Sequence, residues 1–221
     1  MKYSNIQRAT FIDRPNRFIA HVRLNDRTET VHVKNTGRCK ELLLPGAEVW
    51  LTAPGTSGRK TAFDLVAVRK ANGLLINIDS QAPNKVAQEW LLTQSFDRVV
   101  PEYHYGDSRI DFMMQRGEDR LLMEVKGCTL EVDRVGFFPD APTVRGVKHL
   151  RELIHAVKEG YQAILAFVIQ MDGISEVRAN ISTHPEFGIA LEEARSAGVK
   201  ILFLPCHVEP DLLTVRSEER I

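Results

Sequence analysis

The sequence lacks the features that would mark a membrane, secreted or zinc-binding protein. No apolar run approaches the roughly twenty residues that a membrane span needs. The start, Met1-Lys2-Tyr3-Ser4-Asn5, lacks the hydrophobic core of a signal peptide. Three cysteines, Cys39, Cys128 and Cys206, are widely spaced and form no zinc-ligand pattern. We therefore expect reduced thiols in a cytoplasmic protein that makes no membrane contact.

The chain also lacks an internal repeat, a low-complexity segment, a glycine-rich phosphate loop and a net charge. The zero net charge hides an asymmetry between two halves. Residues 1–82 hold 13 Lys and Arg against 7 Asp and Glu, a net charge of +6, and residues 83–221 hold 16 against 22, a net charge of −6. The basic half could attract a polyanion and the acidic half could hold cations. Attraction between the two halves is the alternative interpretation.

Residues 1–82 are predicted to form a small all-β unit. Alternating or apolar runs predict six strands, at 9–12, 18–24, 30–34, 48–53, 63–69 and 74–79. One helix-like insertion, Arg38–Leu44, lies between the third and fourth strands and is closed by Pro45-Gly46. This order favours an OB-like barrel, a fold that commonly binds nucleic acid on one face.

Several cations of this unit are candidates for contacts with nucleic acid. They are Lys34, Arg38, Lys40, Arg59, Lys60, Arg69 and Lys70. Each of them alone is more simply explained as solvated surface. The Asn35-Thr36-Gly37-Arg38 turn is a more specific signal, because glycine there lets the backbone approach a ligand closely.

Residues 83–221 are predicted to form an α/β unit with a mixed sheet flanked by helices. Its predicted elements are a helix at 85–96, a hairpin at 109–126, a helix capped by Thr143 and ended by Gly160, a strand at 163–169, a helix at 185–197 and a strand at 199–204. The two strands outside the hairpin are continuous apolar runs, which is typical of strands buried on both faces.

The predicted hairpin carries two carboxylates and a lysine in alternating sequence. Side chains in a strand repeat every two residues, so Ile110, Phe112 and Met114 are expected to share one face of the sheet. The polar segment Gln115–Arg120 contains one glycine and is a plausible connection between the strands. Folding there would place Asp111, Glu124 and Lys126 together on the other face.

Two close carboxylates form a hard oxygen site for Mg²⁺. A neighbouring lysine could activate a metal-bound water or stabilise charge on a phosphate under attack. A solvated salt bridge between Glu124 and Lys126 is the alternative, although the strand around them is apolar and unpaired charge there would be costly. Glu89 lies at the edge of the apolar stripe of its helix, from which its carboxylate could reach the sheet. A simple boundary glutamate is the alternative for that residue.

The helix after Thr143 carries basic and proton-exchanging side chains, among them Arg145, Lys148 and His149. Its predicted buried stripe is Val147, Leu150, Ile154 and Val157. Some of the polar groups could contact phosphates. A polar outer face explains most of them equally well.

Four segments carry a resemblance to a known family over essentially the whole chain. They are Asn35-Thr36-Gly37, Arg109-Ile110-Asp111-Phe112, Glu124-Val125-Lys126 and the run Phe138–Leu153, in that order. The series resembles the sugar fermentation stimulation protein A family. The helix with a glutamate, the Asp111 strand and the Glu124-x-Lys126 strand also resemble the core of PD-(D/E)XK nucleases. In one departure, Ile110 rather than proline precedes Asp111, which is a tolerated variation.

The resemblance implies an N-terminal OB-like domain over 1–82 and a nuclease-like domain over 83–221. It also implies non-specific DNA binding and a proposed regulatory link to maltose metabolism in bacteria. By motif match, Asp111 and Glu124 would be ligands of Mg²⁺ or Mn²⁺, Lys126 the catalytic-type lysine and Glu89 the helix acid. The expected nucleic-acid contacts are Asn35, Thr36, Gly37, Arg38, Arg109, Arg145, Lys148 and His149.

Three functional hypotheses follow from these expectations. The first is a DNA-binding or regulatory protein whose metal site is structural or vestigial, because a nuclease-like fold can be kept for binding alone. The second is an active Mg²⁺-dependent nuclease. The third is an RNA-binding module that uses the barrel alone.

Overall fold

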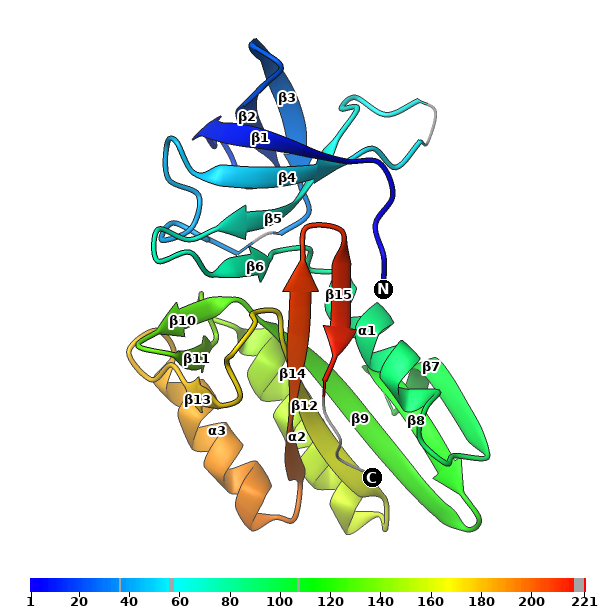
Figure 1. Cartoon of the computed structure of the whole chain (residues 1–221). Helices are drawn as coiled ribbons and strands as arrows, with labels where there is room; N and C mark the ends of the chain where they lie inside the picture. Colours follow the sequence, from blue (N-terminus) through cyan, green and yellow to red (C-terminus); the bar gives the residue numbers. More distant parts are fainter. Residues whose placement is uncertain (36, 56–57, 107, 217–220) are drawn as a thin grey trace.

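A ring of β-strands forms the N-terminal unit of the computed structural model, which describes residues 1–35, 37–55, 58–106, 108–216 and 221 (Figure 1). The strands are β1 (Ile6–Asp13), β2 (Ile19–Leu24), β3 (Arg27–Val33), β4 (Glu48–Thr52), β5 (Asp64–Arg69) and β6 (Leu75–Asn77). Their order in the sheet is β3-β2-β1-β4-β5-β6, and a parallel pairing of β3 with β5 closes the ring. The predicted strands and the OB-like architecture are confirmed.

Alternation of side chains explains how this sheet curls around a core. In β2, Ala20, Val22 and Leu24 are buried, and the residues between them are partly or fully exposed. Every second side chain therefore points into the ring, and apolar burial there stabilises the fold.

The predicted helix at 38–44 is wrong. The segment makes a single turn, in which the amides of Leu42 and Leu43 donate to the carbonyl oxygen of Cys39. Cys39 has a φ of 45°, a left-handed conformation that a right-handed helix cannot include. Leu42 and Leu43 are nevertheless buried, so their apolar character serves the core of the ring rather than a helix.

A mixed six-stranded sheet forms the second unit, in the order β15-β14-β12-β9-β8-β7. A small sheet, β10-β11-β13, lies beside it. The elements are α1 (Ala82–Leu91), β7 (Arg98–Tyr105), β8 (Ser108–Arg116), β9 (Asp119–Cys128), β10 (Leu130–Val132), β11 (Val135–Phe138), α2 (Val144–Lys158), β12 (Gln162–Ile169), β13 (Val177–Ala179), α3 (Pro185–Ser196), β14 (Lys200–Glu209) and β15 (Leu212–Val215). Strand β12 runs parallel to both β9 and β14, and the remaining pairings of the large sheet are antiparallel.

Helices cover both faces of the large sheet (Figure 1). Alternate residues of β12 face opposite ways, so Ala166 packs with Trp90 of α1, and Phe167 packs in the cluster that contains Leu150 of α2. The predicted mixed sheet flanked by helices is therefore confirmed. Among the residues that the structure describes, no helix is both long and apolar enough to cross a membrane.

Helix α2 begins where the sequence predicts, but its buried face is rotated. The hydroxyl of Thr143 accepts a hydrogen bond from the backbone amide three residues later, at 3.0 Å. Leu153 and Ala156 are buried, whereas Ile154 and Val157, predicted for the buried stripe, are only half-buried. The reason is that α2 packs against α3 as well as against the sheet, so two neighbours set its apolar face.

The predicted shared face of Ile110, Phe112 and Met114 is only partly right. Phe112 and Met114 pack with α1, whereas Ile110 belongs to the hydrophobic cluster on the α2 side. The regular pairing of β7 with β8 is interrupted next to Ile110, at Glu102 of β7, whose φ is 52°. This local irregularity breaks the strict period of two on which the prediction depends.

Buried polar side chains join the two units. The amide nitrogen of Gln170 donates to Oδ1 of Asn77 at 2.9 Å and to the carbonyl oxygen of Asp79 at 3.1 Å. Oδ2 of Asp79 in turn accepts from Nζ of Lys34 at 2.9 Å. Asn77, Asp79 and Gln170 are buried, so these hydrogen bonds are satisfied away from water and fix the units relative to each other.

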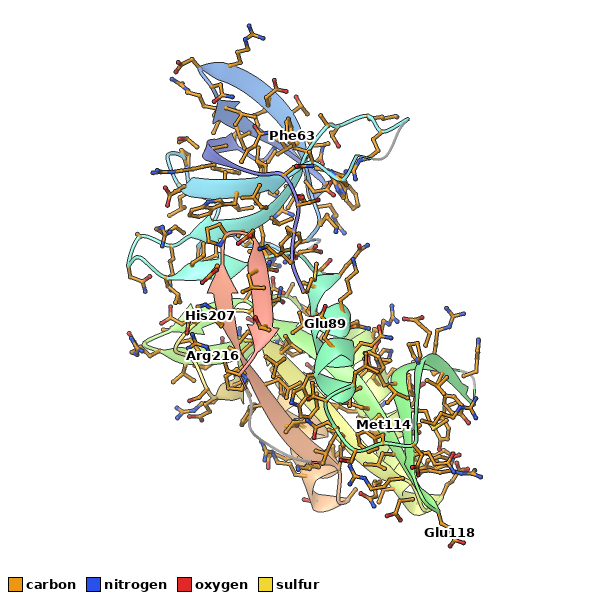
Figure 2. The ribbon with its side chains drawn as sticks, turned by 45° about the vertical axis from the view of Figure 1, so that its right-hand side comes forward. Phe63, Glu89, Met114, Glu118, His207 and Arg216 are labelled. Carbon is orange, nitrogen blue, oxygen red and sulfur yellow. The ribbon has the colours of Figure 1, made fainter. Side chains whose placement is uncertain are left out.

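The hairpin of β14 and β15 reaches towards the ring (Figure 1) and carries a charged cluster near its turn. Nδ1 of His207 lies 2.7 Å from Oδ2 of Asp172, and Nε2 lies 3.0 Å from Oε1 of Glu209. Arg216 lies beside His207 (Figure 2) and pairs with Oδ1 of Asp172 at 3.2 Å. Hydrogen bonds to the two carboxylates raise the pKa of His207.

Candidate functional site

The β8–β9 hairpin ends at a pair of carboxylates. Its ladder of backbone hydrogen bonds starts at the pair Phe112 and Met123. Asp111 lies just beyond that pair, and its Oδ2 accepts the backbone amide of Val125 at 2.8 Å. The side chain of Asp111 thus bonds to the backbone of β9 where the regular ladder has stopped, which holds its carboxylate close to Glu124.

Lys126 is the third member of the group that the sequence predicts, with Asp111 and Glu124. Its Nζ donates to Oε1 of Glu124 at 2.5 Å. The side chain of Glu124 is 2% exposed and that of Lys126 is 14% exposed. The structure therefore brings Asp111, Glu124 and Lys126 together in a largely dry environment, where electrostatic interactions are stronger than in water.

His149 of α2 is a further member of this group. Predicted as a nucleic-acid contact, it is only 5% exposed, and its Nδ1 is hydrogen-bonded to Oε1 of Glu124. The prediction of an exposed phosphate contact at His149 is therefore wrong. The helix face that packs on the sheet carries His149, so its imidazole points inward at the carboxylate.

Two cationic side chains lie beside the imidazole of His149. Nε of Arg145 lies 3.1 Å from Nε2 of His149, and Nζ of Lys126 lies 3.2 Å from its Nδ1. His149 also contacts Oε1 of Glu124 through Nδ1. Arg145, His149 and Lys126 therefore surround Glu124 and hold its carboxylate in one orientation.

The two carboxylates differ in their electrostatic surroundings. Burial alone would raise the pKa of Glu124, but the hydrogen bond from His149 and the charge of Lys126 outweigh it and hold that pKa below its usual value. Burial and the negative charge of Glu124 raise the pKa of Asp111, against the opposing effect of the Val125 amide. The carboxyl of Asp111 therefore lacks sufficient positive charge around it.

One atom of the group has no partner. Oε2 of Glu124 is buried and accepts no hydrogen bond. Leaving a buried carboxylate oxygen unsatisfied is costly, and such an atom in a folded protein calls for an explanation. Among the described residues, no cluster of three or more His, Cys, Asp or Glu side chains is placed to hold a metal ion, so Asp111 and Glu124 form a pair without a third ligand from these side chains.

The predicted helix acid does not belong to this group. The side chain of Glu89 (Figure 2) is 55% exposed and pairs with the amino group of Met1. Helix α1 packs on the sheet through residues such as Val86, and Glu89 lies on another side of the helix. In its place Asn84, in the first turn of α1, donates from Nδ2 to Oδ1 of Asp111 at 2.7 Å.

The Asn35–Arg38 turn lies against the second unit. Nδ2 of Asn35 donates to the carbonyl oxygen of Ile78 at 2.9 Å, and its Oδ1 accepts the amide of Gly37 at 2.7 Å. A Cβ atom on Gly37 would overlap Oδ2 of Asp140. The backbone at Gly37 is therefore closely approached by Asp140 of the protein itself, and its contact with a ligand stays a prediction. Thr36, also predicted as a contact, lies outside the described residues.

The other predicted contacts lie at the surface. Arg38 and Arg145 are exposed. Arg109 pairs with Glu102 at 3.2 Å, and Lys148 pairs with Glu152 at 3.5 Å. Exposed ion pairs of this kind contribute little free energy, so a phosphate could compete for these cations at low cost.

Both units match models of known domains. Residues 12–78 match the SfsA N-terminal OB domain, and residues 81–212 match the sugar fermentation stimulation protein RE domain. The chain belongs to the sugar fermentation stimulation protein family. A homologue in this family from Desulfitobacterium hafniense (strain DSM 10664 / DCB-2) is 51% identical over 214 residues, which cover 96% of this chain and 93% of the homologue. A homologue from Ruminiclostridium cellulolyticum is 48% identical over 225 residues, which cover 100% of this chain and 99% of the homologue.

The family likeness extends to a solved structure, that of Pyrococcus furiosus SfsA in complex with Ca²⁺. It aligns with a TM-score of 0.86 and 28% sequence identity, covering 98% of this chain and 96% of the other. The resemblance stated from the sequence motifs is therefore confirmed. Both the OB domain and the mixed sheet of this chain are architectures of the sugar fermentation stimulation protein family.

Proposed function

We propose that this chain binds DNA non-specifically and holds a divalent cation, Mg²⁺ or Mn²⁺, between Asp111 and Glu124. The observation that carries the metal site is Oε2 of Glu124, a buried oxygen without a partner beside a second carboxylate. Carboxylate oxygens are the ligands that these hard cations prefer. The Pyrococcus furiosus relative was solved in complex with Ca²⁺, which supports binding of a divalent cation in this family.

The residues present fit such an ion. Oε2 of Glu124 and the carboxylate of Asp111 would hold it, and water would fill the remaining positions, because Mg²⁺ usually keeps several waters. A cation there would also offset the repulsion that raises the pKa of Asp111. His149 and Lys126 both bond to Oε1 of Glu124, so they orient that carboxylate and leave its second oxygen for the ion.

The DNA-binding part of the proposal is supported by charge. The first 82 residues carry a net charge of +6. Arg38 on the N-terminal unit and Arg145 on the second unit are exposed cations. Contacts of this kind bind phosphates without reading the bases. We expect affinity to fall steeply with salt, because each neutralised phosphate releases counterions. The proposal includes a regulatory role in maltose metabolism, which the protein would exert by binding DNA.

Phosphodiester hydrolysis is a second candidate function, favoured by the position of Lys126. Its ammonium lies beside the carboxylate pair and is mostly buried, where it could orient a water molecule or stabilise charge that develops on a phosphate. A bound divalent ion would supply Lewis-acid activation of the phosphate and of water. Lys126→Met tests this role. The variant should no longer cleave single- or double-stranded DNA or RNA, and it should still bind nucleic acid.

Titration calorimetry with Mg²⁺ and Mn²⁺ tests the metal site directly. Wild type and Glu118→Gln should bind the ion equally, because Glu118 lies in the exposed turn of the same hairpin (Figure 2). Asp111→Asn should lose binding, because one of the two anionic ligands becomes neutral. Equal affinity in Asp111→Asn and wild type would show that these carboxylates do not hold the ion.

A further inference from the structure

A cationic pocket opens in the OB domain, away from the carboxylate pair. It has a volume of about 590 Å³ and lies between the β1–β2 loop and the segment that follows β3. Four cations line it, Arg14, Arg17, Arg38 and Lys40. Its apolar lining comes from Phe11, Leu43 and Pro45. The pocket thus combines positive charge with an apolar surface.

The four cations of this pocket are not paired with carboxylates. Within the described part of the chain, none of them forms an ion pair, although the negative charges of Asp140 and Glu41 lie near enough to Cys39 in the lining to raise the pKa of its thiol. The acid in the lining, Asp13, already pairs with Nδ1 of His21 at 2.7 Å. Arg17, Arg38 and Lys40 are exposed, so their charges are available to a ligand, and an anion is the ligand that such a site attracts.

Arg14 builds the walls of the pocket. Its Nη1 donates to the carbonyl oxygens of Gly37 at 3.0 Å and Arg38 at 2.9 Å. Its Nη2 donates to those of Arg17 at 2.7 Å and Asn35 at 2.6 Å. One guanidinium therefore ties the β1–β2 loop to the Asn35–Arg38 turn. A pocket held in place by the protein costs a ligand little ordering entropy.

The size and lining of the pocket indicate the class of ligand. A volume of about 590 Å³ is within the range of small-molecule sites and exceeds what a lone phosphate fills. An uncharged sugar would leave the cations without counter-charge, and an ion alone would leave the apolar lining empty. A nucleotide satisfies both, with its phosphate on the cations and its base on the apolar surface. The β1–β2 loop is also one of the loops with which OB folds bind oligomers.

We propose that this pocket binds one unpaired nucleotide of a nucleic-acid strand. The proposal deepens the DNA binding proposed above and rests on it. A base in a duplex is stacked and paired, so it cannot enter a concave pocket, whereas a base in a single strand can. The pocket therefore predicts preference for single-stranded DNA, or for a duplex with an unpaired end, over a blunt duplex.

Fluorescence anisotropy on matched DNA tests this preference. The probes are a single strand of about 12 nucleotides, within the site sizes of OB folds, and the blunt duplex of the same sequence. The pocket variant is Arg17→Glu with Lys40→Glu. The control is Arg23→Glu with Arg27→Glu, which changes the charge equally at exposed positions of the β2–β3 hairpin.

The expected result is a selective loss. Wild type should bind the single strand at least about tenfold more tightly than the duplex, because one stacked base and its phosphate contacts contribute on that order. The pocket variant should lose this preference, and the control should keep it. Equal loss in the pocket variant and the control, or no preference in wild type, would overturn the proposal.

A mononucleotide distinguishes failure of the pocket from failure of the proposed function. Deoxythymidine 5′-monophosphate at millimolar concentration should shift the amide NMR signals of wild type around Arg38, and uncharged thymidine should shift them far less. The shifts should be absent in the pocket variant and unchanged in Asp111→Asn. If wild type bound neither DNA probe, the proposed function would fail, and these shifts would still decide the pocket. Their absence in wild type would refute it.

Discussion

Replacement of Asp111 by Asn is the most informative change to the carboxylate pair. The substitution removes one negative charge and keeps the shape of the side chain. An amide at position 111 can still accept the hydrogen bond of Val125, and Asn84 can turn its own amide to accept instead of donate. The variant should therefore fold, and without metal it should be at least as stable as wild type, because repulsion from Glu124 is gone.

The magnitude of the metal effect follows from mass action. An ion that binds the folded chain at one hundred times its Kd adds about 2.7 kcal/mol to the free energy of unfolding. For a chain of this size, each kcal/mol shifts the Tm by about 2–4 °C. Saturating Mg²⁺ or Mn²⁺ should therefore raise the Tm of wild type by roughly 5–11 °C. The same ion should leave the Tm of Asp111→Asn nearly unchanged.

Differential scanning calorimetry with a chelator and then with millimolar Mn²⁺ measures both quantities. Glu118→Gln is the matched control, since it removes a carboxylate from the exposed turn of the same hairpin and should keep the full shift. A wild-type Tm that does not respond to either ion would refute the metal site. The group would then be a salt-bridge cluster around Lys126, and DNA binding would stand without it.

Three further predictions concern other parts of the molecule. Arg38→Ala should weaken DNA binding and lower the slope of log affinity against log salt by about 0.9, with an unchanged Tm; salt titrations of both proteins check this. Gly37→Ala should destabilise the protein by about 1–3 kcal/mol, because the new Cβ meets Asp140, and denaturant unfolding should show a smaller cost in an Asp140→Ala background. His207→Gln should lower the free energy of unfolding at pH 6 more than at pH 9. The pKa of His207 is raised in the fold, so its contribution is full below about pH 6.5 and is lost as the pH rises through the raised pKa; equal losses at the two pH values would contradict this.

Local patterns in the sequence were sufficient for much of the fold. Alternation located the strands of the ring, and Thr143 located the start of α2, because both signals depend on neighbours in the chain. The helix predicted at 38–44 failed because leucine spacing in a short segment cannot reveal that Cys39 takes a left-handed conformation. The short strands β10, β11 and β13 were missed, since three or four residues carry too little periodicity to detect.

The site was predictable where it depends on the hairpin. Asp111, Glu124 and Lys126 came together because β8 and β9 are neighbouring strands and the side chain of Asp111 bonds to the backbone of β9 between Glu124 and Lys126. Helix α1 begins at Ala82, three residues earlier than predicted. Asn84 therefore lay outside the predicted helix and was missed. Glu89 was predicted instead, because it is an acid at the edge of the apolar stripe.

His149 shows a different limit of the sequence. A histidine among basic residues on a helix was predicted as a nucleic-acid contact, with a polar outer face as the alternative. Only the packing of α2 on β9 reveals that this side chain points at Glu124. The available signal was the position of His149 in the buried face, directly before Leu150. A buried polar group requires a hydrogen-bond partner, so His149 should have been expected to contact one.

The hydrogen bonds from Gln170 to Asn77 and Asp79 limit how the protein can be dissected. A fragment that begins at residue 83 would leave the amide of Gln170 without its acceptors, and the complementary fragment would expose Asp79, which is fully buried in the intact chain. Separately expressed halves would therefore expose polar side chains that are buried in the intact protein. Mapping of activities should rely on point substitutions in the full-length chain, because loss of function in a truncated half would report the broken interface.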